Sequence, residues 1–180
     1  MKLMIASDIH GSAYYCRQML EAFAREKPDC LLILGDLLYH GPRNALPEGY
    51  DPPAVIDMLN GIADELLCVR GNCDAEVDQM VLNFPVLADY AWLNVNDLRI
   101  FATHGHLFGL QNPLKVKKSD VLLAGHTHVP MLTRYNEFTY VNPGSVSIPK
   151  EGSCHSYMTL EGRTFTWKNL AGEVYKTETL

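Results

Sequence analysis

The sequence predicts an α/β fold in which two mixed β-sheets pack as a sandwich and helices flank them. In the first half, apolar strand-like runs alternate with helical stripes in the order βαβαβ, a pattern typical of a parallel sheet with crossover helices. In the second half, short strand-like segments are joined by tight turns, which favours antiparallel pairing. A chain of 180 residues suffices for one well-buried domain over residues 1–180 and is too short for two ordinary domains.

The first half contains three predicted strands, over residues 2–7, 30–34 and 66–69. A helix is expected after Ser12, a residue type that caps helix N-termini, because apolar residues recur at helical spacing from 13 to 24. A second helical stripe runs from 55 to 66, and Asp51 with Pro53 marks its start. Between them lies a long loop rich in glycine and proline, residues 37–52. Long loops inside compact domains are often functional.

The second half is predicted to be mostly strands. One hairpin is expected over residues 92–103 around Asn96-Asp97, and another over 130–142 around Asn136-Glu137. A buried strand covers 121–124 between them, and three further strands follow over 156–160, 163–169 and 174–177. Exposed strand edges in this C-terminal region favour a homodimer or higher homo-oligomer.

Composition narrows the class of protein. The net charge of −6 argues against broad electrostatic binding of nucleic acid. No apolar run is long enough to span a membrane, and the first residues lack the pattern of a signal peptide. The five cysteines are scattered without a Cys-x-x-Cys pair, which indicates a reducing compartment. We therefore expect a cytoplasmic protein with no membrane partner.

Potential metal ligands follow five of the predicted strands. They are Asp8 and His10, Asp36, Asn72, His104, and His126 with His128. Because α/β sheets place their sites at the carboxyl ends of strands, these scattered side chains can converge. Two carboxylates, four imidazoles and one amide oxygen are too many donors for one tetrahedral zinc ion. The set suits two cations if one carboxylate bridges them.

The stretch Gly125-His126-Thr127-His128 gives a more local expectation. If its backbone stays extended after the apolar run 121–124, both imidazoles project to the same side. Spacing alone therefore predicts that His126 and His128 serve one site.

A pair of divalent ions would favour a phosphate substrate. Two such ions carry a charge of +4 and the two aspartates −2, which leaves the site positive. A two-metal site can activate a water and stabilise both the attacking and the leaving oxygen of a phosphoryl displacement. Mixed nitrogen and oxygen ligands suit manganese, iron, nickel, cobalt or zinc.

The motifs Asp-x-His, Gly-Asp, Gly-Asn, His-Gly-His and Gly-His-Thr-His occur in this order. In this order they resemble the calcineurin-like metallophosphoesterases over essentially the whole chain. Three further stretches, Gly71–Asp74, His40–Asn44 and Asn142–Ser145, resemble the small bacterial YfcE-type phosphodiesterases within that family. The resemblance implies a single metallophosphoesterase domain over residues 1–180, with the αββα arrangement of two mixed sheets between helices.

The resemblance also implies a role for each ligand. Asp8, His10 and His128 would hold the first metal, and Asn72, His104 and His126 the second. Asp36 would bridge them together with a water or hydroxide that acts as the nucleophile on a small phosphodiester substrate. On this basis His126 and His128 serve different ions. Manganese is the metal first expected, with zinc, iron, nickel and cobalt as alternatives.

One position departs from the wider superfamily. Many members read Gly-Asn-His-Asp or Gly-Asn-His-Glu, where the histidine contacts the phosphate, but this chain has Cys73. A neutral thiol is a poor proton donor near neutral pH. Substrates with acidic leaving groups, or another donor, are therefore expected. The candidate catalytic residues are Asn72, Cys73, Asp74, His40 and His106, and the candidate substrate-binding residues are Arg43 and Asn44.

Two alternative functions remain open at this point. A phosphomonoesterase or nucleotide phosphatase would use the same ligands with a differently shaped pocket. A metal-binding scaffold protein of the same fold with little activity is the alternative from another class. The presence of all seven candidate ligands argues against a lost metal site.

Overall fold

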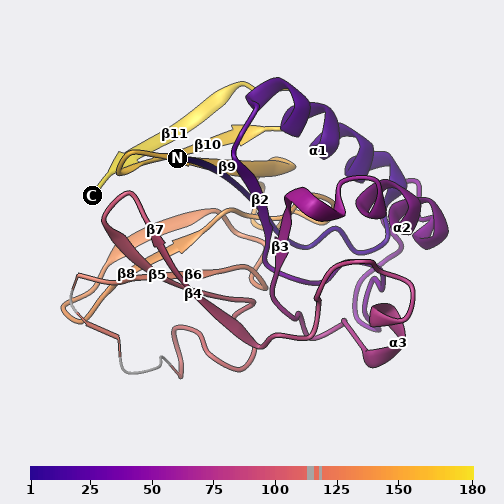
Figure 1. Ribbon diagram of the computed structural model, residues 1–180, viewed down its shortest axis with the longest axis horizontal. Helices are drawn as coiled ribbons and strands as arrows, with labels where there is room; N and C mark the ends of the chain where they lie inside the picture. Colours follow the sequence, from indigo (N-terminus) through magenta and orange to yellow (C-terminus); the bar gives the residue numbers. More distant parts are fainter. Residues whose placement is uncertain (113–115, 118) are drawn as a thin grey trace.

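The computed structural model describes residues 1–112, 116–117 and 119–180, and it contains two β-sheets that face each other (Figure 1). The six-stranded sheet has the order β11-β10-β9-β1-β2-β3 and the five-stranded sheet the order β4-β5-β6-β8-β7. The first consists of β1 (Lys2–Ala6), β2 (Cys30–Ile33), β3 (Leu66–Cys68), β9 (Ser156–Glu161), β10 (Thr164–Asn169) and β11 (Val174–Thr179). The second consists of β4 (Tyr90–Val95), β5 (Leu98–Thr103), β6 (Val121–Ala124), β7 (Met131–Arg134) and β8 (Thr139–Asn142).

Both sheets are mixed, as predicted. Strands β1, β2 and β3 are parallel neighbours, which confirms the βαβαβ interpretation of the first half. Strand β1 pairs antiparallel with β9, so the last third of the chain extends the sheet that the first third begins. In the other sheet, β5, β6 and β8 are parallel to one another, whereas the edge strands β4 and β7 pair antiparallel with β5 and β8.

Helices α1 (Ala13–Glu26) and α2 (Pro52–Asn60) begin where the capping residues predict. The Ser12 hydroxyl accepts the Tyr15 N–H at 3.2 Å, and the Asp51 carboxylate accepts the Ala54 N–H at 3.2 Å. The helical stripe that was predicted to continue to residue 66 ends earlier, at Asn60, and a 3₁₀ turn, η1 (Ala63–Glu65), follows. The four-residue helix α3 (Glu76–Gln79) has too little periodicity to be predicted.

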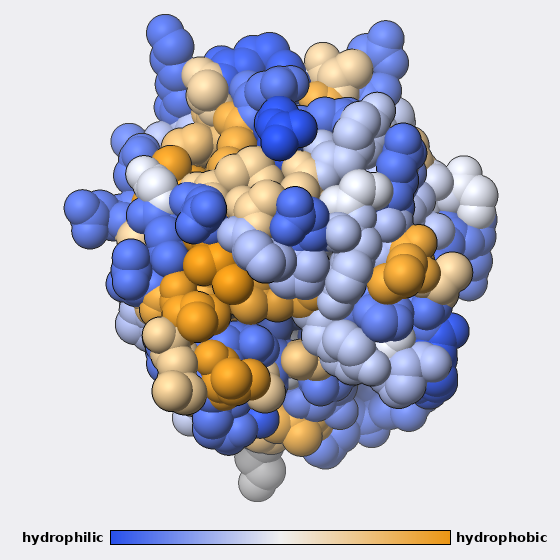
Figure 2. Space-filling view, turned by 90° about the vertical axis from the view of Figure 1, so that its right-hand side faces the viewer, coloured by the Kyte–Doolittle hydropathy of each residue, from blue (hydrophilic) through white to orange (hydrophobic). Residues whose placement is uncertain are grey.

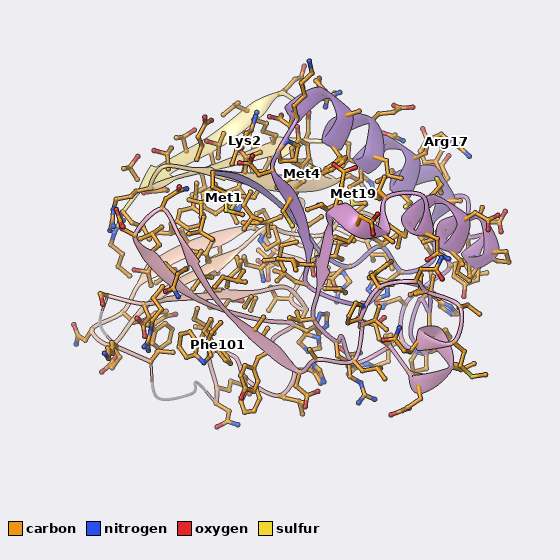
Figure 3. The ribbon with its side chains drawn as sticks, viewed as in Figure 1. Met1, Lys2, Met4, Arg17, Met19 and Phe101 are labelled. Atoms are coloured by element: carbon orange, nitrogen blue, oxygen red, sulfur yellow. The ribbon has the colours of Figure 1, made fainter. Side chains whose placement is uncertain are left out.

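Three apolar layers hold these elements together. Met4 and Met19 belong to the layer between the helices and the six-stranded sheet, and Phe101 lies on the far side of the five-stranded sheet (Figure 3). The middle layer joins the two sheets. Among the described residues no helix covers the outer face of the five-stranded sheet, where Phe108 and Val116 pack instead. The helical cover of this sandwich is therefore concentrated on the six-stranded sheet.

The side of the molecule that carries α2 and α3 shows apolar side chains gathered among polar ones (Figure 2). The exposed apolar residues of this region include Val77, Met80 and Val81, in and directly after α3. Asn60 at the end of α2 donates a side-chain hydrogen bond to the Val81 carbonyl and so ties the α3 segment to α2.

None of the helices in the described part of the chain has the length and hydropathy needed to cross a bilayer.

Two neighbouring leucines test the assignment of the middle layer. Leu32 on β2 is fully buried, whereas its β3 partner Leu67 is 43% exposed. We expect Leu32→Ala to lower the free energy of unfolding by about 3 kcal/mol, because truncation leaves a cavity between the sheets. Leu67→Ala should lower it by less than about 1 kcal/mol. Chemical denaturation measures both, and equal losses would contradict this packing.

Candidate metal centre

The seven predicted ligands meet at one edge of the sandwich. Each follows the carboxyl end of β1, β2, β3, β5 or β6, and parallel neighbours within each sheet bring these ends together. Their donor atoms form two groups that share Asp36.

The first group consists of Asp8, His10 and His128, all buried. His128 Nε2 lies 3.3 Å from Asp8 Oδ1, and His10 Nε2 lies 3.6 Å from the same oxygen. The two Nε2 atoms are 3.4 Å apart. Asp8 Oδ1 is buried and has no hydrogen-bond partner among the described residues. A cation would satisfy this oxygen, since leaving a carboxylate oxygen buried without a partner is costly.

The second group consists of Asn72, His104 and His126. His104 Nε2 lies 3.1 Å from Asn72 Oδ1 and 3.2 Å from His126 Nδ1. Asp36 Oδ2 lies 3.4 Å from His104 Nε2 and 3.7 Å from His10 Nε2. One carboxylate oxygen therefore faces both groups, which is the position that a bridging ligand needs.

Backbone carbonyls fix the tautomers of three of these histidines. The Nδ1–H groups of His10, His104 and His128 donate to the carbonyls of Tyr39, Leu34 and Ile148, at 2.8, 2.6 and 2.5 Å. A carbonyl can only accept, so in the neutral rings the Nε2 lone pairs point inward. Convergent lone pairs repel each other and suit a cation, and second contacts of this kind orient metal-binding imidazoles. This mixed set of nitrogen and oxygen donors therefore fits two divalent cations.

The backbone at the site departs from the extended conformation that spacing alone predicted. His126 and His128 have positive φ angles of 66° and 63°. Asp8, His10 and Asp36 also have positive φ, between 49° and 62°. The extended backbone that this expectation assumed for the Gly-His-Thr-His stretch is therefore wrong, although both imidazoles line the same cavity. Left-handed backbone at both positions instead directs His126 to the second group and His128 to the first. Such strain persists only where surrounding contacts enforce it.

Asp74 supplies part of that enforcement. Its carboxylate accepts backbone N–H groups from Asp36, Leu37 and Gly71 at 2.7–2.8 Å. Asp74 is buried, and it does not line the cavity beside the ligands. This geometry gives Asp74 a positioning role at the end of β2.

The segment after β8 positions the ligands from the opposite side. The hydroxyls of Ser145 and Ser147 both donate to the Asp8 carbonyl at 3.0 Å. The buried Asn142 amide donates to the carbonyl of Gly125 at 2.7 Å, directly before His126. The Asn142–Ser145 motif is therefore part of the site's support, and Ser147 is a supporting residue that the sequence did not reveal.

Charge interactions shift the pKa values of the ligands. Burial favours the neutral form of Asp8, but His10 and His128 overcome it and hold the pKa of this carboxyl well below its usual range. Burial likewise opposes protonation of His104, but Asp36 and Asp8 raise its pKa to about 9. Burial and the charge of His104 lower the pKa of His126 to about 4. A protonated His104 thus neutralises part of the negative charge of Asp8 and Asp36 in the metal-free site.

A polar cavity of about 380 Å³ opens beside the ligands. It is lined by His10, Asp36, Asn72, His126 and His128, and by Gly41, Pro42, Arg43, Asn44, Cys73 and Lys150. The predicted Arg43, Asn44 and Cys73 thus lie at the site. Lys150 was missed, and the available signal was a cation after Pro149 in the loop that follows Asn142–Ser145. Burial and the neighbouring Asp36 raise the pKa of the Cys73 thiol, so the thiol stays protonated.

The two remaining candidates lie further out. His40 does not line this cavity, and its ring packs edge-on against Tyr39 and Tyr50. His106 lines a neighbouring cavity, with its ring centroid 5.4 Å from that of His104. The catalytic roles of His40 and His106 stay predictions.

Comparison with known proteins places this geometry in a family. The family described as the calcineurin-like phosphoesterase superfamily domain matches residues 1–164. The chain belongs to this superfamily. It is 52% identical to phosphodiesterase YfcE of Escherichia coli strain K12 over 161 residues, which are 89% of this chain and 88% of the relative.

Solved structures agree with the superfamily assignment. The structure of YfcE, a phosphoesterase from E. coli, superposes with a TM-score of 0.95 at 47% identity and covers 99% of both chains. Vps29 of Chaetomium thermophilum superposes with a TM-score of 0.64 at 20% identity over 100% of this chain and 97% of its own. At that identity the likeness to Vps29 shows the superfamily fold alone.

Proton release tests the metal site directly. Because the pKa of His104 is about 9 in the metal-free protein, its ring is protonated at pH 7.5 and must lose that proton before Nε2 binds a cation. His10, whose pKa is also raised, adds to the release. We expect binding of Mn²⁺ to release about one proton or more at pH 7.5 and almost none at pH 10.

Calorimetric titrations in buffers of different ionisation enthalpy count these protons. His155 stacks on Tyr15 and donates from Nδ1 to the Val146 carbonyl rather than to a predicted ligand. A His155→Gln variant keeps a donor for this carbonyl and serves as the matched control. Proton release that did not change between the two pH values would contradict the assignment of His104 as a ligand.

Proposed function

We propose that this chain is a binuclear metal-dependent phosphodiesterase. The observation that carries the proposal is Asp36 Oδ2, which faces His10 of the first donor group and His104 of the second. Phosphodiesterase is also the printed name of the relative that is 52% identical over most of both chains. The substrate we propose is a small phosphodiester, and the compartment we propose is the cytoplasm.

When bound, two divalent ions supply an activated water and positive charge for the phosphoryl oxygens. The protein holds the donor atoms in place, because Asp74 and the serines after β8 fix the backbone on both sides of the ligands. Manganese is the ion we propose, and zinc, iron, nickel and cobalt also suit the donor set.

Arg43 and Lys150 line the cavity and form no ion pair with the described carboxylates. They can bind the anionic phosphoryl group and the charge that develops on a leaving oxygen. The Asn44 amide donates to the His40 carbonyl at 2.8 Å and so fixes the loop that presents Arg43. This long loop thus takes part in substrate binding in our proposal.

Metal-dependent hydrolysis tests the proposal. Metal-stripped protein should be inactive on bis-p-nitrophenyl phosphate, and added Mn²⁺ should restore turnover. Asp36→Asn should lower kcat/KM by at least about 100-fold, since it removes charge from the position that faces both donor groups. The His155→Gln control should stay within about twofold of the wild type.

Two other outcomes would point elsewhere. If none of the five metals supported turnover, the scaffold alternative would be favoured. A kcat/KM for p-nitrophenyl phosphate well above that for the diester would favour a phosphomonoesterase.

The thiol at position 73 gives a second test. Asn72 Nδ2 lies 3.2 Å from Cys73 Sγ, and the Cys73 N–H donates to Asp36 Oδ1 at 2.8 Å. We expect Cys73→His to speed hydrolysis of esters with poor leaving groups by about tenfold or more, because imidazolium is a better proton donor. Esters with acidic leaving groups should change little. Kinetics over aryl esters of graded leaving-group pKa measure this, with the exposed Cys154→His as control, and an unchanged dependence would contradict it.

A further inference from the structure

A second cavity, of about 410 Å³, meets the first at His126, which lines both. It lies against the loop that follows β5, with Leu107 and Leu110 on one side and Tyr140 on the other. A group bound at His126 is therefore bordered by two separate cavities. This arrangement fits a phosphodiester, whose phosphorus carries two organic substituents.

The two cavities differ in charge. The first contains Arg43 and Lys150. Among the described residues that line the second, none is Lys, Arg, Asp or Glu. Its walls combine the side chains of Leu107 and Leu110, 44% and 37% exposed, with amide and hydroxyl groups and the imidazoles of His106 and His126. Such a lining suits an uncharged, partly apolar group.

Hydrogen bonds also hold the walls of the second cavity in place. The Asn142 amide donates to the Tyr140 hydroxyl at 3.1 Å and to Thr127 Oγ1 at 3.1 Å, so one buried side chain fixes two wall residues. On the other side, the Asn112 amide donates to the Leu107 carbonyl at 3.1 Å and closes the loop on itself. Walls held in this way are prepared for a ligand.

The charge that develops during hydrolysis indicates which cavity binds the leaving substituent and which binds the retained one. A leaving oxygen gains negative charge and is stabilised next to cations, which are Arg43 and Lys150 in the first cavity. The ester oxygen that stays on the product gains no charge. The substituent that is retained therefore suits the neutral cavity.

We propose that the second cavity binds the retained substituent of the phosphodiester and selects for an uncharged group with an aryl-like apolar face. The inference rests on the proposed function. Leu110 is the residue that determines this preference, because its side chain forms an apolar wall of the cavity and is accessible to a ligand.

Two esters with the same leaving group test this assignment. Phenyl p-nitrophenyl phosphate and methyl p-nitrophenyl phosphate both release p-nitrophenol and differ only in the retained substituent. With Mn²⁺ present, we expect the wild type to prefer the phenyl ester by at least tenfold in kcat/KM. Leu110→Trp narrows the cavity at this wall and should reduce this preference to less than twofold, and Leu110→Ala should reduce it in the same direction.

Leu67→Trp is the matched control, because Leu67 is a partly exposed leucine that lines neither cavity. Its preference should equal that of the wild type. Circular dichroism and Mn²⁺ content establish that each variant is folded and loaded. A wild type that hydrolyses both esters equally, or a Leu110→Trp variant that slows both by the same factor, would overturn the inference alone. A wild type that hydrolyses neither ester overturns the proposed function and the inference together.

Discussion

The Asp74 carboxylate accepts three backbone N–H groups from the ends of β2 and β3, and the arrangement of the centre depends on these contacts. They hold Asp36 in left-handed backbone, where its Oδ2 atom can face both donor groups. They also require close approach of the chain at Gly71, where a β-carbon would lie 2.1 Å from Asp36 Oδ1. A side chain at residue 71 would thus displace the one carboxylate that the two groups share.

Burial and charge act together at this site. Asp8 and Asp36 lie deep in the protein, where an isolated carboxylate is unstable. Histidines compensate part of that charge in the metal-free protein, and the pKa of His104 rises accordingly. Metal ions and protons therefore compete for the same negative charge. One cavity beside His126 is lined by Arg43 and Lys150, whereas the described lining of the other contains no Lys, Arg, Asp or Glu, so the surroundings of His126 differ chemically on its two sides.

Local patterns were enough to predict most of the fold. Alternation, turn residues and caps such as Ser12 and Asp51 act over a few residues, so the strands, α1 and the start of α2 were predicted from sequence. The seven candidate ligands were found for a related reason, since strand ends of an α/β sheet share an edge. Contacts between distant segments were not predictable in this way. The bracing role of Asp74, the approach of Lys150 and the left-handed turn at His126 all depend on partners far along the chain.

The two serine hydroxyls that hold the Asp8 carbonyl come from more than 130 residues further along the chain. Strand β1, after which Asp8 follows, likewise pairs with β9 from the last third of the chain. During synthesis the N-terminal ligands emerge long before the segments that fix their geometry. Contacts of such long sequence separation form late, because loop closure must precede them. A nascent chain would therefore hold Asp8 and His10 in a loose arrangement, and the geometry of the candidate metal centre forms only at the end of folding.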